Sequence, residues 1–147
     1  MLSPMESLAA LLALVLTAVA LVPAAAHVLE LPNKLPLERE AYLIVQQVYR
    51  GWSRLGAVVI AALAATLWLA VVADDASEVP ATLAFLAILM TQVVFWIFTF
   101  PVNQRTRNWT EAPEDWEALR DRWEISHAAN ALLSFIAFVC VALAILA

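Results

Sequence analysis

The chain has 147 residues, of which 64% are hydrophobic and 14% are charged. A soluble domain is typically about half apolar and about a quarter charged, so this composition indicates an integral membrane protein. The formal net charge of −5 and the absence of a basic run argue against a nucleic-acid partner. A single cysteine, Cys140, excludes an intramolecular disulfide and a cysteine metal cluster.

Four apolar runs are long enough to cross a bilayer, which takes about 20 helical residues. They are Leu8–Ala26, Leu55–Ala73, Ala81–Phe100 and Ala128–Ala147. The first run resembles a secretory signal, but it is preceded by Glu6 and by no Lys or Arg, so we expect a retained helix. The sequence predicts one all-α domain over residues 1–147, a four-helix transmembrane bundle with helices over about 8–28, 55–73, 80–100 and 114–147.

Every basic residue lies in one of two loops, between runs one and two or between runs three and four. These residues are Lys34, Arg39, Arg50 and Arg54, and then Arg105, Arg107, Arg120 and Arg122. The positive-inside rule therefore predicts that both loops are cytoplasmic and both termini are outside. The Ala- and Leu-rich composition favours a bacterial inner membrane.

The first helix is predicted to stop at Pro32, shortly after His27 and Glu30, which share a helical face. These two side chains either lie in the wet headgroup region or form a functional pair. The next segment, residues 36–54, is predicted to form a short amphipathic helix at the membrane interface. Its Trp52 and Arg54 fit either an aromatic belt with a snorkelling arginine or a ligand site.

The second helix carries no reactive group, but its small residues permit close approach by another helix, so homo-oligomerisation stays open. The third helix carries Gln92 near its middle, either for an interhelical hydrogen bond or for substrate contact. We expect this helix to end at Pro101, with Asn103 just beyond it.

The last helix is predicted to extend well below the membrane, starting near Pro113. One continuous face of it carries Trp116, Leu119 or Arg120, Trp123, His127 and Asn130. Asn130 lies one turn deeper than His127, where a polar side chain needs a partner. Arg122 and Glu124 are predicted to face solvent.

Each helix thus delivers polar or aromatic groups to the cytoplasmic end of the bundle. Neighbouring helix axes lie about 10 Å apart, so inward-facing groups there would converge on one pocket. The predicted pocket consists of His27, Glu30, Trp52, Arg54, Asn103, Trp123 and His127.

Four motifs carry a resemblance to a known family. They are H-V-L-E-L-P-N-K-L from His27, Y-x₆-Y-x₂-W from Tyr42, P-V-N-Q-R from Pro101 and W-x₆-W-x₃-H from Trp116. Together they resemble the anthrone-oxygenase-like family of small four-helix membrane proteins. The resemblance implies that fold and, as in a minority of relatives, oxidation of an anthrone to an anthraquinone by O₂ without a recognised metal or flavin.

Under this resemblance, an electron-rich carbanion forms when a base removes a proton from an activated aromatic substrate, and the carbanion reacts with O₂. His127 is the predicted base, assisted by His27 or Glu30. An oxyanion would be held by Asn103, Arg54 or Arg120, while Trp52 and Trp123 wall the aromatic ligand. Gln92 and Asn130 complete the predicted substrate contacts.

Two other function classes remain beside this one. His27, Glu30 and His127 are a candidate ligand set for haem, iron or copper in a redox protein, although no cofactor is predicted under the first reading. A non-catalytic membrane subunit or scaffold would use the same Trp, Arg and His residues as interfacial anchors. The predicted partners are the lipid bilayer and a hydrophobic small molecule.

Overall fold

The computed structural model describes residues 3–147, and all of its regular elements are helices. They are α1 (Pro4–Lys34), α2 (Arg39–Gln46), η1 (Gln47–Tyr49), η2 (Trp52–Leu55), α3 (Gly56–Val72), α4 (Glu78–Val94), η3 (Phe95–Thr99), α5 (Phe100–Arg105) and α6 (Trp116–Leu146). Four helical stretches are long and apolar enough to cross a membrane: Pro4–Lys34, Trp52–Val72, Glu78–Arg105 and Trp116–Leu146. The predicted four-helix membrane bundle is therefore confirmed.

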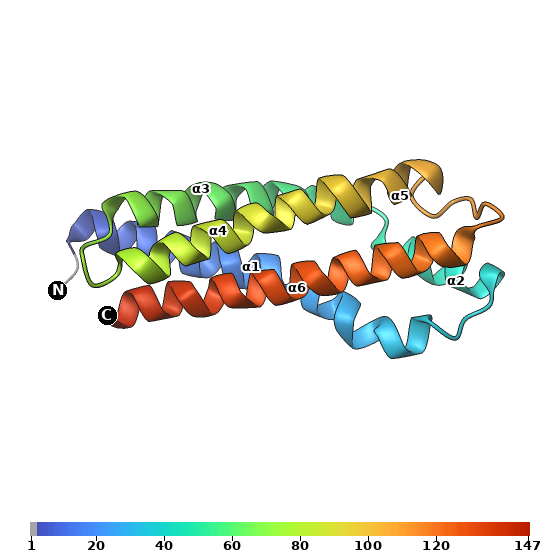
Figure 1. Ribbon diagram of the computed structural model, residues 1–147, viewed down its shortest axis with the longest axis horizontal. Helices are drawn as coiled ribbons and strands as arrows, with labels where there is room; N and C mark the ends of the chain where they lie inside the picture. The colour runs from blue at the N-terminus through green and yellow to red at the C-terminus, as the bar shows by residue number, and fades with distance from the viewer. Residues whose placement is uncertain (1–2) are drawn as a thin grey trace.

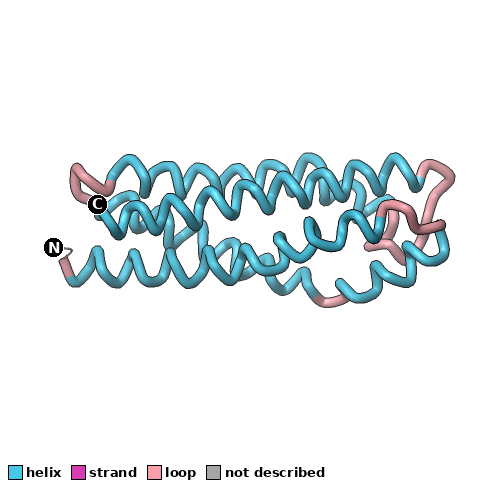
Figure 2. Tube along the Cα trace, turned by 90° about the horizontal axis from the view of Figure 1, so that it is seen from below, coloured by secondary structure: helices cyan, strands magenta, loops and turns pink. Residues whose placement is uncertain are grey.

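The four long stretches run side by side, with both termini at one end (Figure 1). The short helix α2 and the segment that joins α5 to α6 lie at the other end, called here the α2 end. Figure 2 shows that most of the loop segments also gather there. All eight Lys and Arg residues belong to elements and loops of this end.

The core toward the termini is made of small side chains from all four long helices. Ala9, Ala13, Ala65, Ala81, Ala84 and Ala144 are all buried. Small residues let helix backbones approach closely, which is how helices pack where the surrounding lipid is as apolar as the side chains. Large apolar residues such as Leu11, Leu83 and Leu132 are instead exposed on the outside. The arrangement suits a bundle surrounded by hydrocarbon.

Helix α1 does not stop at Pro32, as the sequence suggested, but continues to Lys34. A proline removes one backbone donor and disturbs the turn before it, yet helices in membrane bundles tolerate this. The extra turn has a structural consequence. It brings Lys34 one turn after Glu30 and turns its side chain into the protein, where only 2% of it is exposed.

The predicted end of the third helix at Pro101 is also wrong, because the helix continues through α5 to Arg105. Pro101 has no N–H to donate to the carbonyl of Ile97, four residues earlier. The chain passes this point with the π-helical turn η3, and Arg122 Nη2 donates a hydrogen bond of 2.8 Å to the Ile97 carbonyl. The guanidinium thus takes the place of the missing backbone donor.

The α2 end has an aromatic core of its own, formed by Tyr42, Val102, Trp109, Leu119 and Trp123. Tyr42 comes from the predicted amphipathic segment, whose Ile44 and Val48 face outward. Gln47 Nε2 donates to the Trp109 carbonyl at 3.1 Å, and Arg39 donates to the Ala112 carbonyl. These bonds join α2 and η1 to the loop before α6, so α2 covers the end of the bundle.

Candidate functional site

Two histidines from different helices stack on each other inside the α2 end. The ring centroids of His27 on α1 and His127 on α6 are 4.1 Å apart, with 30° between the ring planes. Trp123, one turn before His127, lies 4.1 Å from the His127 ring and 5.0 Å from the His27 ring. Tyr49 and Trp52 add two more rings, at 4.4 Å and 5.9 Å from His27. The histidine pair is therefore enclosed by aromatic walls.

The two imidazoles differ in their polar contacts. His27 Nδ1 lies 3.5 Å from Lys34 Nζ. An ammonium group only donates, so Nδ1 is the acceptor and a neutral His27 carries its proton on Nε2. His127 Nε2 is buried without a hydrogen-bonding partner among residues 3–147, and so is Asn130 Oδ1, one helical turn deeper. Buried polar atoms without a partner are costly, so both are available to a ligand.

A buried ion pair lies directly beside the histidines. Lys34 Nζ is 3.0 Å from Glu124 Oε2, and the two side chains are 2% and 1% exposed. Tyr42 OH donates to the other oxygen of Glu124 at 2.9 Å. The prediction that Glu124 faces solvent is therefore wrong. Lys34 at the end of α1 and Tyr42 of α2 bury the Glu124 side of α6, and neither contact was expected from the sequence.

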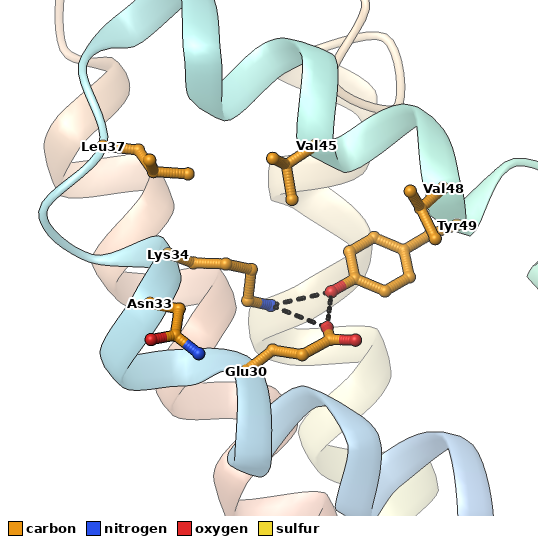
Figure 3. A pocket seen from close by; sticks show the side chains of 7 residues that line it. All are labelled: Glu30, Asn33, Lys34, Leu37, Val45, Val48 and Tyr49. Carbon is orange, nitrogen blue, oxygen red and sulfur yellow. Dashed lines mark hydrogen bonds and ion pairs between the residues drawn. The ribbon is translucent and has the colours of Figure 1, made fainter.

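Lys34 also belongs to a triangle of polar groups, drawn with dashed lines in Figure 3. Its Nζ donates to Tyr49 OH at 3.1 Å and lies 3.9 Å from Glu30 Oε2. Tyr49 OH in turn donates to Glu30 Oε2. The ammonium thus donates to Tyr49 and His27 and forms an ion pair with Glu124, and these contacts together offset its buried charge.

Both tyrosines of this network lie outside the membrane-spanning helices, and the pKa of each is raised above the ordinary value. Burial is the main cause for Tyr42, followed by the negative charge of Glu124 and the hydrogen bond to it. Burial is also the main cause for Tyr49, followed by its hydrogen bond to Glu30. Both phenols therefore stay protonated and serve as hydrogen-bond donors.

Asn103 reaches the cluster because the helix continues past Pro101. Its Oδ1 accepts a 2.8 Å hydrogen bond from Trp123 Nε1, which fixes the indole against the histidines. The Asn103 amide nitrogen remains available as a donor. A second link, 2.8 Å between Thr99 Oγ1 and Ser126 Oγ, joins η3 to α6 just below.

Three predicted substrate contacts lie apart from the histidine pair. Arg54 is an exposed side chain on η2. Arg120, whose side chain is 14% exposed, donates to the Leu35 carbonyl at 3.0 Å and stacks on Trp116. Gln92 is half-buried on α4, with its amide 3.4 Å from Thr91 Oγ1.

The sequence analysis missed Lys34 and Glu124 as interior residues and Tyr49 as a hydrogen-bonding partner. Spacing offered a signal for both charges. Lys34 follows Glu30 by four residues and Glu124 precedes His127 by three, so each shares a helical face with a predicted site residue.

Two pockets open on either side of the ion pair. The first has a volume of about 310 Å³ and is the one drawn in Figure 3, lined by Glu30, Asn33, Lys34, Leu37, Val45, Val48 and Tyr49. The second, of about 360 Å³, is lined by Leu31, Leu35, Arg120, Asp121, Glu124 and Ile125. Because Lys34 lines one and Glu124 the other, the ion pair lies between them.

The candidate metal ligands do not form a ready cluster. Among residues 3–147, no three His, Cys, Asp or Glu side chains are grouped so that they would share a metal ion. Glu30 is instead bonded to Tyr49 and lies near Lys34. The redox-metal alternative from the sequence stays a prediction for elemental analysis.

The fold and this cluster define a class: a polytopic helical membrane protein with an aromatic and ionisable site at one end of its bundle. Residues 45–140 match the family model described as anthrone oxygenase, and the chain belongs to this family. The matched region contains Trp123 and His127 but begins after His27 and Lys34, which belong to α1. No curated protein and no solved structure matches the chain.

Proposed function

We propose that this protein is an oxygenase of the anthrone-oxygenase type, which uses O₂ to oxidise an activated aromatic or other hydrophobic substrate without a resident cofactor. Family membership supports the reaction type. The observation that carries the proposal is the free Nε2 of His127, buried against aromatic walls and next to a second histidine whose Nδ1 accepts from Lys34.

The reaction begins when His127 Nε2 removes a proton from a CH₂ group flanked by aromatic rings. The carbanion passes one electron to O₂, and the radical pair combines to form the C–O bond of a peroxide, which is protonated to a hydroperoxide. Loss of the second C–H proton to the base breaks the O–O bond. The products are a carbonyl group and water, so one O₂ supplies both oxygen atoms and the CH₂ carbon is oxidised to the ketone level.

Neutral donors near His127 favour this first step. Lys34 Nζ lies 5.5 Å from the centre of the Trp123 ring, but Glu124 and Glu30 offset its charge, so stabilisation of a substrate anion falls to neutral hydrogen-bond donors. The amide nitrogen of Asn103 is free to donate to the developing oxyanion, because its oxygen is bonded to Trp123. Trp52 and Trp123 provide flat surfaces for aromatic rings.

The orientation belongs to the same proposal. All eight basic residues at the α2 end favour a cytoplasmic location for that end and for the site, with both termini outside, and a bacterial inner membrane suits this arrangement. Reporter fusions at Ala147 and within the loop at Arg107 test it. Reporter activities that place Ala147 in the cytoplasm and Arg107 outside would overturn the orientation.

Oxygen uptake tests the activity directly. Purified protein in detergent is given a hydroxylated anthrone, and O₂ consumption is followed with quinone formation. We expect His127→Gln to lower the rate about 100-fold or more, because general bases contribute roughly that factor. The matched control is Glu117→Gln, on the exposed face of the same helix.

Two results would contradict the proposal. One is a wild-type rate no higher than the spontaneous oxidation of the anthrone in detergent alone. The other is full activity of His127→Gln. The first result would favour the non-catalytic scaffold, and the second would remove His127 from the role of the base.

A further inference from the structure

We infer that the pocket between α1 and the α2–η1 segment is a lipid-facing portal that selects neutral, hydrophobic molecules carrying an aromatic hydroxyl group. The inference rests on the proposed function in one respect, because it takes the histidine pair as the destination of the selected molecule. The pocket itself is separate from that pair, and its chemistry is visible in its own residues (Figure 3).

The portal has apolar walls and a polar floor. Leu37, Val45 and Val48 form the walls, while Lys34 and Glu30 carry the charges of the floor. The volume of about 310 Å³ lies at the lower end of the range for small-molecule sites, about 300–1,000 Å³. Such a pocket takes a flat apolar body that presents one polar edge.

Exposed apolar side chains lie on the portal wall and on the outer faces of the two helices that form it. Val48, on its wall, is 66% exposed, and Ile44, next to Val45 on α2, is 72% exposed. Leu29, which precedes Glu30 on α1, is 78% exposed. In a membrane protein, apolar side chains exposed at this level contact lipid rather than water, so a ligand arrives from the bilayer.

The charges of the floor decide which polar edge it accepts. One ammonium, Lys34, faces two carboxylates, Glu30 and Glu124. Together with Glu124, which lies behind the floor, these groups carry a net charge of −1 and repel ligand carboxylates and phosphates. Glu30 contacts Tyr49 and Lys34 through Oε2, and Oε1 is left to accept from a ligand hydroxyl. A neutral hydroxyl donor is therefore the matching group.

Tyr49 demonstrates this chemistry within the protein. Its phenol accepts from Lys34 at 3.1 Å and donates to Glu30, so the floor already binds one aromatic hydroxyl. A ligand phenol that takes over these two bonds leaves no buried charge without a partner. Tyr49 also stands between the portal and His27, 4.4 Å from its ring. Gly51, with φ of 91°, follows two residues later and gives the segment a turn that other residues rarely adopt.

Binding in lipid nanodiscs tests the portal separately from catalysis. The probes are a dihydroxyanthraquinone, which cannot undergo the oxidation, its dimethyl ether and an anthraquinone carboxylate. Affinity is measured by the quenching of tryptophan fluorescence, corrected with empty nanodiscs. We expect the dihydroxy compound to bind about tenfold or more tightly than either other probe, since a hydrogen bond to a charged group is lost in the ether.

Two substitutions on α2 form a matched pair. Val45→Phe fills the portal and should weaken binding of the dihydroxy probe about tenfold. Ile44→Phe, on the lipid-exposed side of the same helix, should leave it within about twofold. Both add the same side chain to a short surface helix, so general effects on folding are shared.

The outcomes separate the portal from the proposed activity. Equal binding of all three probes, or an unchanged affinity in Val45→Phe, overturns the portal even if O₂ uptake is found. The expected ranking with a tenfold loss in Val45→Phe supports the portal even if O₂ uptake fails. In that case only the assignment of the oxygenase reaction is lost.

Discussion

Removal of Lys34 should destabilise the bundle more than removal of any single exposed charge. In Lys34→Met the carboxylate of Glu124, 1% exposed, keeps only the hydrogen bond from Tyr42. Breaking a buried ion pair from one side costs about 3–5 kcal/mol because an uncompensated charge stays buried. We therefore expect the free energy of unfolding of Lys34→Met to fall by about that amount.

Substitution of the other partner, Glu124, should cost less, because Lys34 has more polar neighbours than Glu124 has. In Glu124→Gln the Lys34 ammonium keeps the Tyr49 hydroxyl at 3.1 Å and the Glu30 carboxylate at 3.9 Å. The glutamine side chain also retains an oxygen to accept from Tyr42. The loss should be about 1.5–3 kcal/mol, the range for a hydrogen bond to a charged group.

The double variant Lys34→Met/Glu124→Gln completes the cycle. Since no charge of the pair is then left alone, its loss should be smaller than the sum of the two single losses by about 2 kcal/mol or more. Reversible unfolding in mixed micelles with increasing dodecyl sulfate, followed by circular dichroism, measures all three. Glu117→Gln is the exposed control. A loss below about 1 kcal/mol for Lys34→Met, or additive losses, would refute the buried pair.

Three further measurements follow from the same contacts. Arg122→Gln should lose about 1–2 kcal/mol of unfolding free energy, because the Ile97 carbonyl loses its donor. This loss should be smaller in a Pro101→Ala background, where residue 101 again has a backbone N–H. Equal losses in both backgrounds would contradict the role of Arg122 as a replacement donor. An alkaline titration should show no tyrosinate absorbance from Tyr42 or Tyr49 at pH of about 10, where unfolded protein titrates. Because both folded pKa values are raised, the stability from these neutral phenols is complete below that pH and is lost as the pH rises through the folded values; normal titration of the folded protein would refute the buried network. The purified protein should carry no stoichiometric iron or copper and no visible absorption band, and either one would favour the redox-metal alternative over a cofactor-free oxygenase.

Most of the membrane architecture could be predicted from the sequence, because it depends on properties that a single chain displays. Four apolar runs of sufficient length, separated by charged loops, leave few alternatives. The same runs fix which residues lie at equal depth. For this reason His27, Trp52, Trp123 and His127 could be placed at one end of the bundle, and the structure brings them together.

The errors came from effects that a local pattern does not contain. Pro32 and Pro101 are usual helix ends in water, but here each helix passes its proline. At Pro101 the compensation comes from Arg122 on another helix, which a local rule cannot foresee. The burial of Glu124 likewise depends on α2 folding back over α6, a tertiary contact between distant parts of the chain.

The prolines also explain how the site is assembled. Had α1 ended at Pro32, Lys34 would belong to a loop and would not be held beside His27 and Glu124. Had the third stretch ended at Pro101, Asn103 would not be positioned by a helix against Trp123. Both helices thus extend past their prolines by less than two turns, and each extension supplies a polar contact to the histidine pair or its aromatic wall. Lys34 and Asn103 thus reach the α2 end through these extensions, because the four apolar runs themselves carry no charged side chain.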